Sequence, residues 1–283
     1  MKCRLDSRRI ADAEALKSGM DSLLAVIDRS VSGYNPGSLL SRYNSGETIS
    51  DDGSPEYAIF NRLTAYCDSL YIATKGIIDT RAAALFDAWG FGFKEGHLPD
   101  AETVAAAKED RSRMNFNAVA QGYSADLIGS YLRSKGITDM MVNIGGEIYC
   151  NGVNPNGEGW RLAIDAPIDG NDTPGAVTSA TVVLEKGREC GIVTSGNYRK
   201  FYIENGEKYS HTIDPRTGAP VKHNLLSATI IAPTSALADA LATYCMVVGK
   251  EEAAAMIKSR DDLEGCLITS DGIWYSEGIT LDR

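Results

Sequence analysis

The first half of the chain carries apolar residues at the three- and four-residue spacing of a helix with one buried face. The pattern covers residues 7–31 and 59–75. A short polar helix is predicted at residues 101–109, and a longer helix at residues 119–134. Gly76 and Gly136 follow two of these segments, in the position that favours a left-handed C-terminal cap. The sequence therefore predicts four helices before residue 140.

The connections between these helices are predicted to be loops and turns. SLLSRYN (residues 38–44) leads into a polar loop that ends near Pro55. Asp79 lies at a helix-to-loop junction after the second helix. It is followed by DAWGFGF (residues 87–93), in which large aromatic residues are mixed with glycines. Such a mixture fits a buried, irregular turn better than a helix.

The second half is rich in β-branched residues separated by turn formers. The predicted strand segments are residues 140–152, 160–167, 179–187 and 225–233. Asn205-Gly206 and Asp271-Gly272 are typical of tight hairpin turns. Helices that precede strands favour an α+β fold, with helices packed on a largely antiparallel sheet, over a doubly wound parallel one. Residues 1–283 are expected to form one domain, or two tightly packed halves with a weak boundary near residues 100–115.

Composition and charge exclude some functions. Residues are 43% hydrophobic and 23% charged, as in ordinary globular proteins, and no run approaches the ~18 to 20 apolar residues of a membrane span. The net charge of −10 argues against a nucleic-acid surface, which needs clustered Lys and Arg. A phosphate ligand would need a cation or oriented amides, because like charges ~4 Å apart repel by roughly 4 kcal/mol at a dielectric of 20.

The six cysteines are scattered without any Cys-x-x-Cys spacing. They predict mostly buried free thiols rather than a zinc or redox site. The first residues, MKCRLDSRR, lack the apolar core of a signal peptide. Either the chain is cytosolic, or an export segment has been removed.

Asp239 and Thr243 stand four residues apart on a further predicted helix, whose N-cap is Thr234 or Ser235. Their carboxylate and hydroxyl are hard ligands of the kind that Mg²⁺ prefers. The same helix carries a separate apolar stripe, so this pair need not be buried against the core. The stripe consists of Leu237, Leu241, Tyr244 and Val248. The alternative is a solvated aspartate and a threonine bonded back to the backbone.

His211 is one of three histidines, and Asp214 could orient or charge its ring. A surface histidine beside a turn is the competing interpretation. Gly145-Gly146 permits a close backbone approach to a ligand, but a strand bulge is favoured. Residues 194–196 could offer hydroxyls and amides to a phosphate, but an ordinary turn at a strand end is favoured.

Seven segments occur in one order along nearly the whole chain. They are SLLSRYN (38–44), GIID with AWGFG (76–92), NFNAVAQGYSAD (115–126), VNIGGE (142–147), TSGNYRKFY (194–202), HTIDPRTGAPV (211–221) and ADALAT (238–243). Their joint occurrence is highly specific, and the chain resembles the ApbE-type FAD:protein FMN transferase family. The resemblance implies an ApbE-like fold over residues 1–283.

The resemblance also implies an enzyme that cleaves the FAD pyrophosphate with Mg²⁺, passes FMN to a Ser or Thr hydroxyl of an acceptor protein and releases AMP. Asp239, Thr243 and the Ala118 carbonyl would hold the metal. The flavin contacts carried over by position are Tyr34, Ile77, Ile78, Asp79, Asn115, Gln121 and Ile213. We expect His211 to be the general base for the incoming hydroxyl, with Asp214 orienting it.

Two other functions would use much of the same machinery. Water as the nucleophile would make the chain an FAD pyrophosphatase, and a non-enzymatic flavin carrier would have no use for the metal pair. Members of the family are commonly exported lipoproteins, so the resemblance implies the periplasmic side of the cell envelope and a lipid anchor in the full-length precursor. A cytoplasmic protein is the alternative. The expected partners are FAD and an acceptor protein, without nucleic acid.

Overall fold

The computed structural model describes the chain except residues 6–11, 93–97, 169–170, 172, 174, 198–200, 205 and 283. The described residues group into two compact units. The sheet unit comprises residues 1–20, 121–200 and 222–283, and the helical unit comprises residues 21–120 and 201–221. The chain thus changes unit after residues 20, 120, 200 and 221, rather than at one boundary near residues 100–115.

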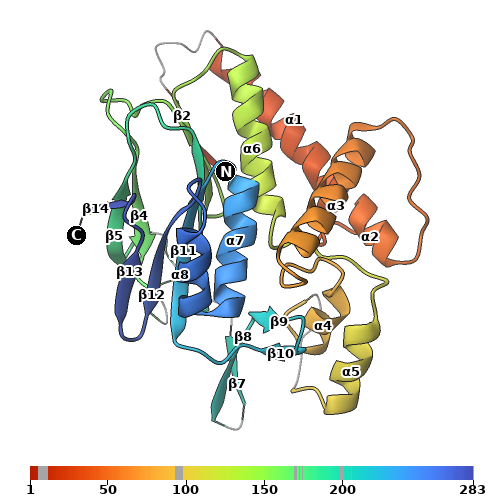
Figure 1. The fold of residues 1–283 in the computed structure, drawn as a ribbon. Helices are drawn as coiled ribbons and strands as arrows, with labels where there is room; N and C mark the ends of the chain where they lie inside the picture. Colours follow the sequence, from red (N-terminus) through yellow and green to blue (C-terminus); the bar gives the residue numbers. More distant parts are fainter. Residues whose placement is uncertain are drawn as a thin grey trace. The chain divides into compact units, whose positions relative to one another are not determined.

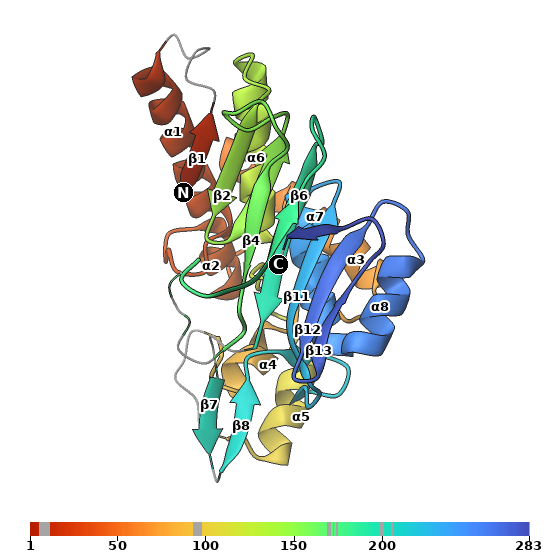
Figure 2. The ribbon, with the colours of Figure 1, turned by 90° about the vertical axis from the view of Figure 1, so that its left-hand side faces the viewer.

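A seven-stranded sheet is the largest element of the sheet unit (Figure 2). In spatial order its strands are β1 (Lys2–Leu5), β2 (Met140–Ile144), β3 (Glu147–Asn151), β6 (Cys190–Gly196), β11 (Leu225–Ala232), β12 (Glu264–Thr269) and β13 (Gly272–Tyr275). Every neighbouring pair is antiparallel. This confirms the predicted α+β class, although β1 precedes the helices.

Helices cover one face of this sheet (Figure 1). They are α6 (Ala120–Ser134), α7 (Ser235–Val248) and α8 (Lys250–Lys258). The core on this face joins Val193 and Ile230 of the sheet to Ala238 and Ala242 of α7. Small residues on α7 let its backbone approach the strands closely.

A second, three-stranded sheet covers the other face. Its order is β14 (Thr280–Asp282), β5 (Thr178–Val183) and β4 (Arg161–Asp165). Leu162 and Val182 of this sheet share a core with Ile192 and Ile231 of the large sheet. Because both faces of β11 are covered, its sequence LLSATIIA is apolar nearly throughout rather than alternating.

Two predictions about small residues were wrong. Gly145-Gly146 is a two-residue turn that joins β2 to β3, with φ of 75° and 128°, because glycine supplies the positive φ of a hairpin turn. Residues 194–196 lie inside β6, paired with β11, and are not a turn. The hairpin after β12 turns at residues 270–271, one residue earlier than predicted, and Asn205 lies outside the described residues.

The helical unit contains short helices and two small hairpins. The helices are most of α1 (Ala13–Val31), α2 (Leu39–Asn44), α3 (Pro55–Ala73), α4 (Ala83–Ala88) and α5 (Ala101–Glu109). The hairpins are β7 (Phe201–Glu204) with β8 (Glu207–Ser210), and β9 (Ile213–Asp214) with β10 (Ala219–Pro220). SLLSRYN forms α2, with Ser38 as the N-cap that accepts from Ser41 N, and the predicted loop to Pro55 follows it.

The aromatic segment 87–93 was partly misjudged. Its first two residues complete α4, and the turn begins at Trp89, the C-cap. Gly90 has φ of 73°, and the Phe91 amide donates to the Phe86 carbonyl at 2.9 Å. This is a Schellman cap. Phe93 lies outside the described residues.

The cysteine prediction is confirmed. Five of the six free thiols are buried, and Cys3 is half-buried. Burial raises the pKa of the Cys67 thiol to about 12, and burial also raises that of Cys190 to about 12. Across the described residues, no helix combines the length and apolar character that a membrane crossing requires.

We expect Cys3 alone to react readily with Ellman's reagent in the native protein, because the other five thiols are buried away from the reagent. Partial burial raises the pKa of Cys3 too, so its reaction should speed up as the pH rises, since the thiolate is the reactive form. One thiol per chain should react at neutral to mildly alkaline pH, against six in denaturant. Cys3→Ser should abolish the native reaction. Fast labelling of a second thiol would contradict the buried placement of the other five.

Candidate active site

The start of α7 is fixed by polar contacts within the sheet unit. Thr234 is its N-cap and accepts from Leu237 N, as predicted. The Asp126 carboxylate of α6 accepts from Ser235 N at 2.8 Å and from Ala236 N at 2.9 Å. A carboxylate at a helix N-terminus satisfies free amides and complements the helix dipole.

Asp239, on the second turn of α7, is 4% exposed. The Gly122 amide of α6 donates to its Oδ2 at 3.1 Å, and Thr243 follows one turn later, half-buried. Asp239 is therefore buried, and the alternative of a solvated aspartate does not hold. The sheet packs against the small residues of α7, so Leu237 and Tyr244 of the predicted stripe are only partly buried.

The electrostatics around Asp239 suit a cation. Burial raises the pKa of Asp239 well above its usual value, and the charges of Glu147 and Asp126 raise it further, although the Gly122 hydrogen bond lowers it. A divalent ion would offset this repulsion and hold the carboxylate ionised. The Asp239 carboxylate and the Thr243 hydroxyl thus fit a hard ion such as Mg²⁺.

The remaining ligands of such an ion would be backbone, water or substrate oxygens. Within the described residues, no group of three or more His, Cys, Asp or Glu side chains is placed to hold a metal. The predicted backbone ligand, Ala118, is half-buried in the turn that precedes α6 and belongs to the helical unit.

Gln121 and the β2–β3 turn form a second polar feature of the sheet unit. A Cβ atom on Gly145 would lie 2.1 Å from Gln121 Nε2, so a side chain there would displace the amide. Gln121 is exposed. This arrangement leaves its amide and the turn backbone available to a ligand.

The predicted flavin contacts of the helical unit differ in what they can offer. The side chains of Ile77, Ile78 and Ile213 are buried in the core, so these residues could present backbone groups only. Tyr34 is 74% exposed.

Asp79 and Asn115 are held by the helical unit itself. Both carboxylate oxygens of Asp79 accept from the Arg111 guanidinium. The Asn115 amide donates to the Thr80 carbonyl at 2.7 Å, and its side chain accepts from the Asn117 amide. The segments 77–80 and 115–118 are therefore joined by their backbones.

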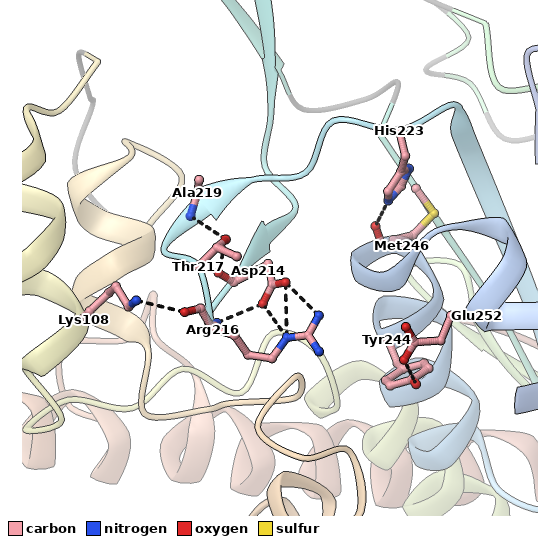
Figure 3. A network of polar contacts seen from close by, with 9 residues as sticks. All are labelled: Lys108, Asp214, Arg216, Thr217, Ala219, His223, Tyr244, Met246 and Glu252. Atoms are coloured by element: carbon pink, nitrogen blue, oxygen red, sulfur yellow. Dashed lines mark hydrogen bonds and ion pairs between the residues drawn. The ribbon is translucent and has the colours of Figure 1, made fainter.

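The segment after His211 is built around Asp214 (Figure 3). The Arg216 guanidinium donates to both Asp214 oxygens, at 3.0 and 2.9 Å. Burial alone would raise the pKa of the Asp214 carboxyl, but the hydrogen bonds from Arg216 lower it. Asp214 thus fixes the following turn, and its expected role of orienting His211 stays a prediction.

Sequence reasoning missed several residues that organise these parts. Asp126 and Glu147 end the segments NFNAVAQGYSAD and VNIGGE, so both lay inside motifs already singled out. Arg111 and Arg216 gave no sequence signal beyond a charge near an aspartate. Asp126 and Glu147 could have been found from the sequence, because each is an acidic residue that ends a motif of the family that also supplies the predicted metal ligand Asp239.

The fold is that of an α+β protein. Its α7 packs on one face of an antiparallel sheet and carries a buried carboxylate, Asp239, that suits a cation. The model of the ApbE family matches residues 1–267, and the chain belongs to this family. The FAD:protein FMN transferase of Escherichia coli (strain K12) is 32% identical over 95% of this chain and 80% of its own length.

Solved structures agree. The flavin transferase ApbE from Vibrio cholerae has a TM-score of 0.77 at 28% identity, covering 95% of this chain and 90% of that one. The flavinyl transferase ApbE of Pseudomonas stutzeri, in its apo form, has a TM-score of 0.75 at 27% identity, covering 94% and 87%. The chain is thus an enzyme of the transferase class.

Asp239 should make the metal-free protein less stable as the pH rises. Its pKa is raised in the folded state above the ordinary value of 3.8, so the native carboxyl keeps a proton that the unfolded chain has lost. The contribution of this group to the free energy of unfolding is fully present below pH 3.8. It is lost as the pH rises through the folded pKa, at up to about 1.4 kcal/mol per pH unit.

Urea unfolding in EDTA, from about pH 5 to pH 8, checks this on wild type and Asp239→Asn. Asparagine keeps an oxygen for the Gly122 amide but cannot ionise. The free energy of unfolding should therefore fall more steeply with pH in wild type. Parallel curves would show that Asp239 has an ordinary pKa.

Proposed function

We propose that this chain is a Mg²⁺-dependent FAD:protein FMN transferase that attaches FMN to a Ser or Thr hydroxyl of an acceptor protein and releases AMP. The names of its relatives support the FAD donor and the protein acceptor. The observation that carries the metal dependence is the buried Asp239 carboxylate beside the charges of Glu147 and Asp126.

In this proposal Asp239, Thr243 and the Ala118 carbonyl hold Mg²⁺. When bound, the ion supplies charge neutralisation at the FAD pyrophosphate and polarises the phosphate under attack. The Gly122 amide holds the Asp239 carboxylate in one orientation. A protein with a net charge of −10 needs such help to accept a pyrophosphate.

The proposed transfer exchanges one P–O bond for another. The acceptor hydroxyl oxygen attacks the phosphorus on the FMN side of the pyrophosphate, a new P–O bond forms, and the bond to the bridging oxygen breaks, so AMP leaves with that oxygen. His211 accepts the hydroxyl proton. An unassisted alcohol is a poor nucleophile at neutral pH, and a positioned base contributes about 10² to 10⁴ in rate.

The flavin would be held by an aromatic ring, by backbone groups and by polar side chains. Tyr34 offers an exposed ring, Ile77, Ile78 and Ile213 offer backbone groups, and Asp79, Asn115 and Gln121 offer polar groups. An envelope location and a lipid anchor in a longer precursor stay predictions.

A peptide library tests the proposed function. The chain, FAD and MgCl₂ are incubated with peptides that each contain one Thr, and with matched peptides that carry Val in its place. Mass spectrometry should find a phosphoflavin adduct on Thr peptides alone, with equimolar AMP. AMP release without any adduct would identify an FAD pyrophosphatase. If neither AMP nor an adduct forms, the chain would be a flavin carrier.

Asp239→Ala should abolish Mg²⁺-dependent AMP release while leaving flavin binding detectable, because the metal loses its carboxylate ligand. Thr243→Val should raise the Mg²⁺ concentration needed for half-maximal rate, since it removes one neutral ligand and keeps the shape. AMP release is followed by chromatography, and FAD binding by flavin fluorescence. Near-normal turnover by Asp239→Ala would remove the metal role.

His211→Asn should slow transfer by about 10² to 10⁴ and change the dissociation constant of FAD little. The reason is that a base acts on the acceptor hydroxyl and not on the bound flavin. Single-turnover rates and flavin titrations separate the two quantities. Wild-type transfer by this variant would make His211 structural.

A further inference from the structure

Four aromatic side chains of the helical unit stack in sequence, and we call them the aromatic ladder. They are Phe91, Tyr202, Tyr209 and Trp89. The ring centroids are 5.2 Å apart for Phe91 and Tyr202, 5.3 Å for the two tyrosines, and 6.0 Å for Tyr209 and Trp89, with interplanar angles of 21° to 28°. Such offset stacks are favourable beyond the area that they bury.

The ladder joins two parts of the helical unit. Tyr202 and Tyr209 face each other across the β7–β8 hairpin, and a two-stranded hairpin is marginally stable by itself. Trp89 and Phe91 come from the turn after α4. The hairpin therefore depends on this turn for its support.

The turn that carries Phe91 is closely constrained. Gly90 supplies the positive φ of the Schellman cap, and a Cβ atom on Gly92 would lie 3.1 Å from Asp87 Cα and closer still to its carboxylate. Trp89 Nε1 donates to the Gly218 carbonyl at 2.8 Å. The Phe91 ring thus projects from a backbone that packing and hydrogen bonds hold in place.

His211 lies at the end of this ladder. It follows the last residue of β8, Ser210, and its imidazole centroid is 6.4 Å from that of Phe91, with the rings at 66°. An edge-to-face contact at this separation is a favourable aromatic arrangement, so it favours this orientation of the imidazole. The carboxylate of Asp214, by contrast, is occupied by Arg216.

We propose that Phe91 is a positioning residue for His211, holding the imidazole in the orientation in which it takes a proton from the acceptor hydroxyl. This inference rests on the proposed function. The transfer chemistry gives the AWGFG segment no role, and this proposal does. Its glycines set the turn, Trp89 anchors the turn, and Phe91 places the base.

The test is a double-mutant cycle on the full chain. Phe91→Leu removes the ring and keeps much of the volume, Phe91→Tyr restores the ring, and both are made with and without His211→Asn. Phe91→Leu should slow transfer to the Thr peptides by about 10- to 100-fold and change the FAD dissociation constant by less than about threefold. Phe91→Tyr should recover most of the rate.

In the His211→Asn background, Phe91→Leu should cause almost no further loss, because a residue that acts through His211 has nothing left to position. Rate losses that multiply in the double variant would overturn the proposal. Tyr202→Phe is the matched control: it keeps the stacked ring and removes a hydroxyl that has no hydrogen-bond partner among the described residues, so it should transfer FMN at close to the wild-type rate.

Nuclear magnetic resonance separates this proposal from the proposed function. The chain has three histidines, so the His211 imidazole signals can be assigned with His211→Asn. Loss of the Phe91 ring current should shift them, and freedom of the imidazole should bring them toward the values of an unconstrained histidine. Unchanged signals in Phe91→Leu would overturn the positioning role, whether or not the wild-type chain labels a peptide. A shift without any labelling by wild type would instead reject the transferase.

Discussion

The sheet unit depends on one close approach, that of α6 to the first turn of α7. A side chain on Gly122 would place its Cβ atom 2.2 Å from the Ser235 carbonyl oxygen. Because glycine stands there, the Gly122 amide reaches Asp239. Asp126, one turn later on α6, reaches the free amides of α7. The close approach at Gly122 therefore determines both how the two helices pack and where the buried Asp239 carboxylate lies.

That constraint has an energetic cost. A buried carboxylate with acidic neighbours is unfavourable in its ionised form, and the single amide of Gly122 offsets part of this. A cation that binds the folded protein would recover the rest and would stabilise the fold by mass action. The charge that destabilises the metal-free protein is thus the same charge that would drive metal binding.

Local patterns predicted the elements well where local interactions decide them. The helix at residues 101–109 was placed with its observed bounds, because its N-cap and periodicity are both local. The spacing of Asp239 and Thr243 also placed both on one helix, α7, and their role as metal ligands stays a prediction. The burial of Asp239 was not predicted, because it depends on which face of α7 meets the sheet, and the small residues that allow close packing gave no hydrophobic signal.

One other misjudgement has the same physical origin. Gly145-Gly146 is compatible with a bulge or a hairpin turn, and the pairing of Ile144 with Glu147 decides between them. Asp214 stands three residues from His211, and its carboxylate accepts a bidentate contact from the Arg216 guanidinium, a strong geometry that sequence spacing alone did not indicate.

The AWGFG turn shows how far a mixed aromatic and glycine segment can be interpreted. Gly90 is required by its positive φ, and Gly92 by the close approach of Asp87. Backbone geometry thus accounts for the glycines but places no demand on the side chains of Trp89 and Phe91. The aromatic character of Trp89 and Phe91 must have another cause, and the stacked rings of the β7–β8 hairpin supply it. Because that hairpin leads directly into His211, the packing that stabilises it also determines where the imidazole lies.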